Sequence, residues 1–192
     1  MKSLWLEDKK GNGYKSLREE KNVDVCIIGG GLTGITCGYL LTKEGYSTCI
    51  LEKDTILSKT SGNTTAKITS QHGLFYDYLI NSFGEELAKE YFEANEEAIK
   101  EIKNIIKEEK IDCDLEDQNA YVFTNEPKEL EKIKLEVKAV NSLGGNSVFL
   151  EKTELPFNHI GAIEIKNQAM FNPVKYGIEL ANKIVNKKRR YI

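Results

Sequence analysis

The stretch Val23-Asp-Val-Cys-Ile-Ile-Gly-Gly-Gly-Leu-Thr-Gly34 decides the fold of this 192-residue chain. An apolar strand runs directly into the pattern Gly29-x-Gly31-x-x-Gly34, and the residues that follow have a helical pattern. A second apolar strand, 49–51, ends at Glu52. A strand, a glycine-rich turn, a helix and an acidic end to the next strand, all within about 30 residues, are typical of a βαβ unit that binds a dinucleotide.

Each glycine of the pattern has a mechanical role. Gly29 lets the chain turn tightly off the strand, Gly31 lets the backbone approach a pyrophosphate, and Gly34 lets the helix pack closely on the sheet. The N–H groups and the positive dipole end at the start of the helix favour an anion there. Glu52 follows Gly34 by 18 positions, where a carboxylate accepts hydrogen bonds from ribose hydroxyls. The alternative is a glycine-rich turn in an ordinary α/β domain.

The motif therefore predicts a group of cofactor-binding residues. They are Gly29, Gly30, Gly31, Leu32, Thr33, Gly34 and Glu52.

Composition limits the class of protein. With 40% hydrophobic and 30% charged residues, the chain has the composition of a soluble globular protein of one domain or slightly more. A net charge of −3 gives no reason to expect a nucleic acid partner. The segment 1–8 lacks the apolar core of a signal peptide, and no later segment is long and apolar enough to span a membrane. We therefore expect a cytoplasmic protein.

Cysteine and histidine are few and widely spaced. The four cysteines, Cys26, Cys37, Cys49 and Cys113, show no C-x-x-C spacing, and His72 and His159 are the only histidines. We expect no metal site, and we interpret the cysteines as small buried apolar residues. Both histidines are interpreted as structural, so no catalytic acid or base is assigned.

The chain between the first unit and the next helix is unusual. Residues 54–72 are rich in Ser and Thr and predict a long loop at the carboxyl ends of the strands, where its hydroxyls and amides would face the ligand. A solvated linker is the alternative. Before the βαβ unit, residues 1–22 predict a polar arm that packs Trp5, Leu6, Tyr14 and Leu17 on the body.

The remaining elements alternate without regular βα repeats. We expect helices over 32–44, 74–83, 85–110, 127–143 and 173–185, and strands over 120–124, 147–150 and 161–165. Asn172 and Pro173 provide the start signal of the last helix. The long helix has an apolar stripe made of Leu87, Tyr91, Ala94, Ala98, Ile102 and Ile105.

This pattern predicts an α/β fold in which an α+β domain is inserted into a Rossmann-like unit. No third parallel strand has appeared by residue 185, so we expect the chain to end before the sheet is completed. The basic run 187–190 is interpreted as a solvated helix end. Four parts are expected: an arm (1–22), the βαβ unit with the Ser/Thr loop (23–73), a helical and α+β region (74–170), and a helix that returns to the first unit (171–192).

The fingerprint, continued by Thr60-Ser-Gly-Asn-Thr-Thr-Ala-Lys-Ile-Thr-Ser-Gln-His-Gly-Leu74, resembles the FAD-dependent oxidoreductases of the D-amino acid oxidase family. It is most similar to the bacterial glycine/D-amino acid oxidases and gamma-glutamylputrescine oxidoreductases. The segment Met170-Phe-Asn-Pro-Val-Lys-Tyr176 is also similar to that family, so the resemblance extends over nearly the whole chain. Members of the family continue well beyond this length.

The resemblance implies FAD as cofactor and a small-molecule amine or amino acid as substrate. Gly29, Gly31 and Gly34 would face the FAD pyrophosphate, Glu52 the adenosine ribose, and Lys53 the adenine end. The residues implied to line the pyrophosphate and the approach to the isoalloxazine ring are Ser61, Thr65, Ala66 and Lys67. Lys67 would stabilise charge on the flavin, or would be an ordinary surface lysine. The implied reaction oxidises a C–N bond by hydride transfer to the flavin, and the domain inserted after the FAD-binding βαβ unit would be of substrate-binding type.

Two alternatives stay open. The first is an NAD(P)-dependent dehydrogenase that uses the same fingerprint. The second is a catalytically incomplete FAD-binding remnant, or a half-protein that needs a complementing chain.

Overall fold

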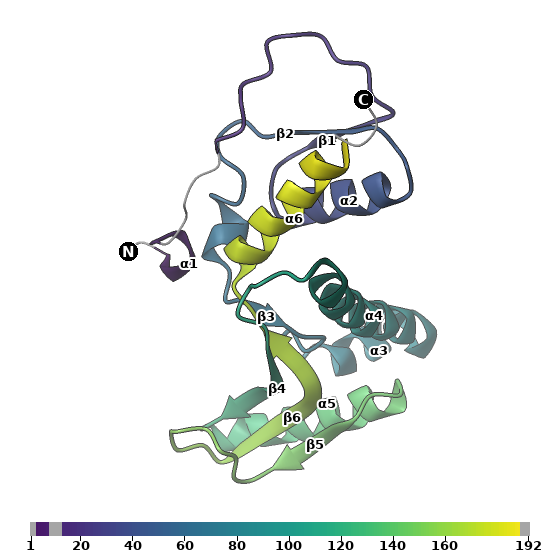
Figure 1. Cartoon of the computed structure of the whole chain (residues 1–192). Coiled ribbons are helices and arrows are strands. Elements are labelled where there is room, and N and C mark those ends of the chain that lie inside the picture. Colours follow the sequence, from purple (N-terminus) through teal and green to yellow (C-terminus); the bar gives the residue numbers. More distant parts are fainter. Residues whose placement is uncertain (1–2, 8–12, 189–192) are drawn as a thin grey trace. The chain divides into compact units, whose positions relative to one another are not determined.

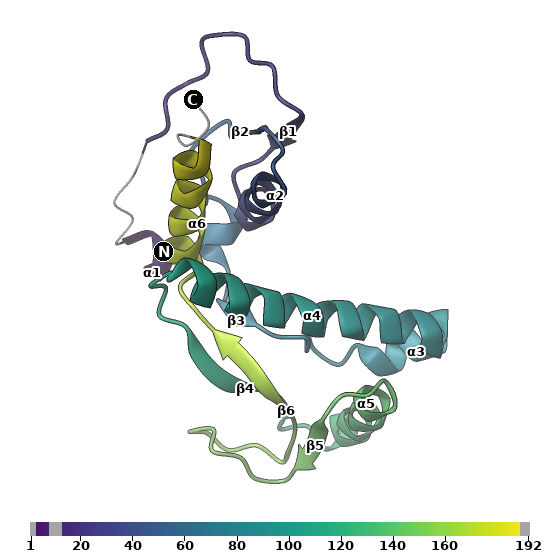
Figure 2. The ribbon, with the colours of Figure 1, turned by 45° about the vertical axis from the view of Figure 1, so that its right-hand side comes forward.

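A computed structural model describes residues 3–7 and 13–188 of the chain (Figures 1 and 2). The chain divides into two compact units. Unit 1 combines the residues up to Ala66 with 106–114 and those from Phe171 onward, and unit 2 combines 67–105 with 115–170. The mixed α/β class predicted from the sequence is confirmed, and the second unit interrupts the first in the chain.

Unit 1 contains the predicted βαβ motif. Strands β1 (Val25–Ile28) and β2 (Thr48–Leu51) are parallel neighbours, and α2 (Leu32–Lys43) connects them. The backbone leaves β1 through Gly29, whose φ of 112° lies in the region that favours glycine. Helix α2 ends as predicted before Gly45, which also has a positive φ (94°).

Two glycines bring α2 against the strand pair. A Cβ atom on Gly34 would lie 2.0 Å from the carbonyl oxygen of Gly29, and one on Gly38 would lie 2.8 Å from Cδ1 of Ile50. The approach at Gly34 meets backbone and leaves no room for a side chain, whereas the approach at Gly38 meets the end of the Ile50 side chain, which would have to move. The roles predicted for Gly29 and Gly34 are confirmed.

Helix α6 (Pro173–Lys188) completes the core of unit 1 beside α2 (Figure 1). Asn172 begins it, because its Oδ1 accepts the N–H groups of Val174 (3.1 Å) and Lys175 (3.0 Å), as the N-cap prediction requires. The side chain of Leu57 is buried against Gly177 of this helix. The basic run predicted to be solvated lies at the edge of or outside the described residues.

Unit 2 is built on an antiparallel sheet. The long strand β6 (Gly161–Met170) has β4 (Glu116–Thr124) along one side, and both β3 (Lys67–Ile68) and β5 (Ser147–Leu150) also pair with it. The helices of this unit are α3 (Tyr76–Phe83), most of α4 (Glu85–Glu109) and α5 (Leu130–Ser142), which follows the short helix η2 (Pro127–Glu129). The expected departure from parallel βα alternation is confirmed.

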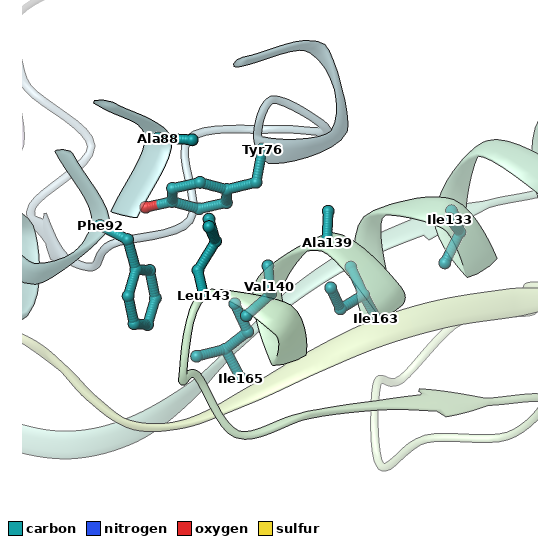
Figure 3. Packing of buried hydrophobic residues seen from close by; sticks show 9 residues of the cluster. All are labelled: Tyr76, Ala88, Phe92, Ile133, Ala139, Val140, Leu143, Ile163 and Ile165. Carbon is teal, nitrogen blue, oxygen red and sulfur yellow. The ribbon is translucent and has the colours of Figure 1, made fainter. Parts of the chain in front are cut away.

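The core of unit 2 lies between α5, the start of α4 and one face of the sheet (Figure 3). The rings of Tyr76 and Phe92 meet edge to face at 5.4 Å, and the hydroxyl of Tyr76 donates to the carbonyl oxygen of Ser70 (2.6 Å). The members of this core are Tyr76, Ala88, Phe92, Ile133, Ala139, Val140, Leu143, Ile163 and Ile165.

One carboxylate is fully buried in unit 2. Glu136, on α5, accepts hydrogen bonds from the backbone N–H groups of Phe75 (2.7 Å), Tyr76 (3.0 Å) and Asp77 (3.0 Å) at the start of α3. The side-chain amide of Gln71 also donates to it, at 2.7 Å. Glu136 thereby joins α5 to α3, and the N-terminus of α3 stabilises its negative charge.

Three expectations from the sequence are wrong in detail. Of the stripe predicted for α4, Ile105 is buried and Ile102 half-buried, whereas Leu87, Tyr91, Ala94 and Ala98 are exposed. The other buried residues of this helix are Ala88, Phe92, Ile99 and Ile106. Helical spacing allows two stripes one position apart, and contacts distant in the sequence select between them. The predicted loop 54–72 is not continuous either, because it contains the short helix η1 (Thr60–Asn63) and β3, which pairs with β6.

The third correction concerns the cysteines. Cys113 is buried as predicted and Cys49 is half-buried, but Cys26 and Cys37 are exposed. Strand alternation explains the exposure of Cys26. Ile27 faces α2 at Gly34 and Gly38, so its neighbours in the strand face the opposite side. That other face of β1 is open, and Ile28 is 90% exposed.

The polar arm packs only in part. Trp5 and Leu6 are half-buried, with α1 (Leu4–Glu7) lying on unit 1, whereas Tyr14 and Leu17 remain 47% and 51% exposed. Among residues 3–7 and 13–188, no helix combines the length and the hydropathy needed to cross a membrane.

Replacing Gly34 by Ala tests the close approach of α2. The added methyl group would collide with the backbone carbonyl of Gly29, which cannot move without displacing the turn. We expect the free energy of unfolding, measured by urea denaturation, to fall by about 3 kcal/mol. Gly13→Ala is the matched control, because a Cβ there has nothing within 4 Å. An equal effect of both substitutions would contradict the packing described.

Replacing Glu136 by Gln tests the buried carboxylate. An amide group cannot accept all four hydrogen bonds and carries no charge for the start of α3, so we expect a loss of about 2 to 3 kcal/mol in the free energy of unfolding. Glu131→Gln, at an exposed position of the same helix, is expected to have no measurable effect. Equal stability of the Glu136→Gln variant and the parent chain in urea would show that the carboxylate is not needed.

Candidate dinucleotide site

The start of α2 offers backbone N–H groups to an anion. The first bond of the helix runs from the N–H of Ile35 to the carbonyl of Gly31 (3.0 Å), so the N–H groups of Leu32, Thr33 and Gly34 precede the intrahelical pattern. Leu32 N–H donates to Ser61 Oγ at 3.0 Å. For Thr33 and Gly34, no acceptor is found within the part of the chain that the structure describes. These donors suit a phosphate group.

Glu52 lies directly beside the glycine turn. Its Oε2 accepts the N–H of Gly30 (2.8 Å) and its Oε1 accepts the N–H of Asp54 (3.0 Å). These backbone donors, Asp54 first and Gly30 second, hold the pKa of the Glu52 carboxyl below its ordinary value of 4.5. The side chain is therefore ionised at neutral pH and is fixed in direction, with further lone pairs available to hydroxyl donors.

Gly30 has a role that the motif alone does not reveal. A Cβ on Gly30 would lie 2.6 Å from Cγ2 of Ile56 and 3.0 Å from Cβ of Glu52. Its carbonyl accepts the N–H of Leu57 at 2.9 Å. The chain after β2 therefore folds back onto the glycine turn, and Gly30 makes room for it.

The segment 57–66 is held at both ends by unusual backbone. Leu57 and Ala66 are buried and have positive φ values of 59° and 63°, which costs free energy for residues with side chains. Leu57 is fixed by its contact with Gly177, and Gly62 approaches the Leu57 carbonyl so closely that a Cβ would lie 2.2 Å from it. Ser61 is thereby held next to Gly31, where a Cβ would come within 3.0 Å of Ser61 Oγ.

A cleft of about 980 Å³ has Glu52 in its lining. Its lining includes the strand β2, the residues 52–56, the arm from Gly13 to Glu19, and Ala181, Ile184 and Val185 of α6. This volume lies at the upper end of the usual range for sites that bind small molecules and cofactors. The cleft belongs entirely to unit 1.

The structure brings together part of the predicted set. Residues 29–34, Glu52 and Ser61 form one cluster. Lys53 and Thr65 are exposed, Ala66 is buried, and Lys67 is exposed on β3, which belongs to unit 2. Within the described residues of unit 1, no hydrogen bond joins Lys53, Thr65 or Ala66 to the glycine turn. The predicted contacts of these three residues and of Lys67 with the cofactor stay predictions.

The two histidines have local partners in unit 2. His72 Nε2 lies 3.3 Å from Asn95 Oδ1, and the ring of His159 lies 3.1 Å from both Thr153 Oγ1 and the Phe157 carbonyl. Over residues 3–7 and 13–188, no three potential ligands from His, Cys, Asp and Glu gather as a metal site would need. The N–H groups of Thr33 and Gly34, which have no acceptor within the described residues, and the ionised carboxylate of Glu52 have the chemistry that a pyrophosphate and a ribose would require.

Known proteins resemble this chain in sequence and in fold. The sequence profile of the family described as FAD dependent oxidoreductase (DAO) matches residues 24–190. A relative in Bacillus subtilis, named putative Rieske 2Fe-2S iron-sulfur protein YhfW, is 38% identical over 96% of this chain and 36% of its own length. Gamma-glutamylputrescine oxidoreductase of Escherichia coli is 27% identical over 59% of this chain and 26% of its own length.

Among solved structures, L-proline dehydrogenase from P. horikoshii superposes with a TM-score of 0.71 at 16% identity, over 88% of this chain and 43% of that protein. This likeness shows the fold. The chain thus spans about a third of the length of the Bacillus relative and less than half of the solved structure. The match over residues 24–190 confirms the resemblance found in the glycine motif and its continuation, and the chain belongs to the DAO family of FAD-dependent oxidoreductases.

Proposed function

We propose that this chain is the FAD-binding portion of an oxidoreductase that oxidises a C–N bond of a small amine or amino acid. The observation that carries the proposal is the cluster of Glu52, Ser61 and the glycine turn around the start of α2. Family membership supports FAD over NAD(P), which is the enzyme alternative. The name of the Escherichia coli relative supports an amine substrate.

The residues of the cluster have separate tasks in this proposal. The N–H groups of Thr33 and Gly34 bind the pyrophosphate, with Leu32 and Ser61 beside them. The ionised Glu52 binds the ribose hydroxyls, and Lys53, which lines the same cleft as Glu52, contacts the adenine end. Bound FAD supplies the acceptor for the hydride equivalent from the carbon that carries the amine.

The remaining roles rest on the family resemblance. We propose that Thr65, Ala66 and Lys67 line the approach to the flavin ring, and that no residue described here acts as the catalytic acid or base. Residues 23–73 would form the FAD-binding part behind an arm (1–22), residues 74–170 the substrate-type region, and residues 171–192 the helix that returns to the FAD-binding part. A cytoplasmic location is part of the same proposal.

Substrate turnover would involve parts beyond these 192 residues. The chain covers 36% of the Bacillus relative, which supports further residues of the same protein or a complementing chain as contributors to the active site. The name of that relative also supports an iron–sulfur centre as the acceptor of electrons from the flavin. We assign no residue of this chain to such a centre, because the described residues contain no group of three His, Cys, Asp or Glu side chains that could hold a metal ion.

Replacing Glu52 by Gln tests the proposal. The purified chain is expected to bind FAD and to contain no iron, and the variant is expected to bind FAD about 30-fold more weakly, because a charged acceptor of ribose hydrogen bonds is lost. Flavin fluorescence titration gives the two dissociation constants. Glu44→Gln, at an exposed position just after α2, is the matched control.

The pH dependence follows from the lowered pKa of Glu52. A carboxylate whose pKa is lowered in the folded chain stabilises the fold fully above the ordinary pKa of 4.5, and this stabilisation is lost as the pH falls through the lowered pKa. Glu52 is therefore fully ionised, and able to accept hydrogen bonds from FAD, throughout the neutral range. The affinity of the parent chain for FAD should therefore not change through Glu52 between about pH 6 and 8. Binding of NADH in place of FAD, or equal FAD affinity of parent and variant, would contradict the proposal.

A further inference from the structure

Residues 3–7, here called the N-terminal clasp, lie against the segment that carries Ser61. The indole Nε1 of Trp5 donates to the carbonyl oxygen of Thr64 at 2.9 Å. The hydroxyl of Ser3 donates to the carbonyl oxygen of Gly62. Leu6 covers the same glycine, because a Cβ on Gly62 would lie 2.8 Å from Cδ2 of Leu6.

The segment held in this way also contacts α6 and approaches the Leu57 carbonyl, but within the described residues the only hydrogen bond between its side chains and another element is that of Ser61. The short helix η1 has no side-chain cap, and the hydrogen bonds of Gly62 N–H (3.1 Å) and Asn63 Nδ2 (2.6 Å) both go to the nearby carbonyl of Lys59. Its connection to the glycine motif is the hydroxyl of Ser61, 3.0 Å from the N–H of Leu32. Asn63 and Thr65 are exposed.

We propose that the N-terminal clasp positions the FAD site: Ser3 and Trp5 hold residues 60–64 so that Ser61 meets the start of α2. This inference rests on the proposed binding of FAD at that place. The connection is continuous, from Trp5 to Thr64, along the turn to Ser61, and from there to Leu32. Trp5 and Ser3 are positioning residues, since neither reaches the glycine turn itself.

Thermodynamic linkage requires that FAD and the N-terminal clasp stabilise each other. If the clasp favours the turn that binds FAD, FAD must stabilise the clasp by the same factor. A single hydrogen bond between uncharged groups corresponds to about a five-fold change in a dissociation constant. Trp5 is the only tryptophan of the chain, so its indole N–H gives one separate signal in a proton spectrum.

The first experiment compares FAD dissociation constants by flavin fluorescence. Trp5→Phe keeps an aromatic ring and removes the donor, so its dissociation constant is expected to rise about five-fold. Ser3→Ala is expected to have a similar effect, and Ser3→Thr, which retains the hydroxyl, to restore the parent value. Leu4→Ala is the matched control on the same short helix, because Leu4 is 68% exposed.

The second experiment follows hydrogen exchange of the Trp5 indole N–H by NMR. Saturating FAD is expected to slow the exchange about five-fold or more, which a merely structural role of Trp5 would not produce. In the cofactor-free chain, Ser61→Ala is expected to accelerate the exchange, because the turn loses its bond to Leu32.

The outcomes separate this proposal from the proposed function. Parent-like FAD affinity of both Trp5→Phe and Ser3→Ala overturns the clasp while leaving FAD binding intact. Failure of the parent chain to bind FAD contradicts the proposed function for this chain alone. In that case the test is the hydrogen exchange of the Trp5 indole N–H in the cofactor-free chain. An unchanged exchange rate in the Ser61→Ala variant overturns the clasp, and a faster rate supports it.

Discussion

The close approach of Gly34 to the carbonyl of Gly29 is the constraint on which unit 1 depends. It leaves no room for a side chain and brings the start of α2 directly over the end of β1. The N–H groups of Leu32, Thr33 and Gly34 therefore lie at the carboxyl ends of the two parallel strands. The same turn offers the Gly30 N–H to Glu52, so one backbone bend positions both the start of α2 and the Glu52 carboxylate, the two groups that we propose bind the pyrophosphate and the ribose.

Unit 2 depends on a different kind of interaction. Its sheet and helices share an apolar core, but the join between α5 and α3 is a buried carboxylate at a helix start. Backbone dipoles at the start of α3 and the side-chain amide of Gln71 stabilise the charge of Glu136. These hydrogen bonds also hold the chain just before α3 in place. Both units thus use the N-terminus of a helix. In unit 2 the start of α3 binds the side chain of Glu136, and in unit 1 the start of α2 has N–H groups available for a ligand.

The βαβ motif was predictable because its requirements are local. Positive φ at Gly29, close packing at Gly34 and the carboxylate at the end of β2 are all within one short stretch. The buried stripe of α4 and the strand β3 were mispredicted because partners far along the chain determine them. For the same reason the roles of Gly30, Leu57 and Gly177 could not be predicted from the sequence, since each depends on a contact between separate segments. The only sign of the clasp in the sequence was a single tryptophan in a polar arm. Its role could be inferred only once the structure showed its hydrogen bond to Thr64.

The central claim is that the start of α2 binds the pyrophosphate of FAD. Amide proton and nitrogen spectra of the labelled chain, recorded while FAD is added, test it most directly. The account predicts saturable shifts that are largest for the N–H groups of Thr33 and Gly34, with smaller shifts at Gly30 and Asp54 around Glu52. Saturable binding that leaves these amides unshifted, or no binding by a folded chain, would contradict it.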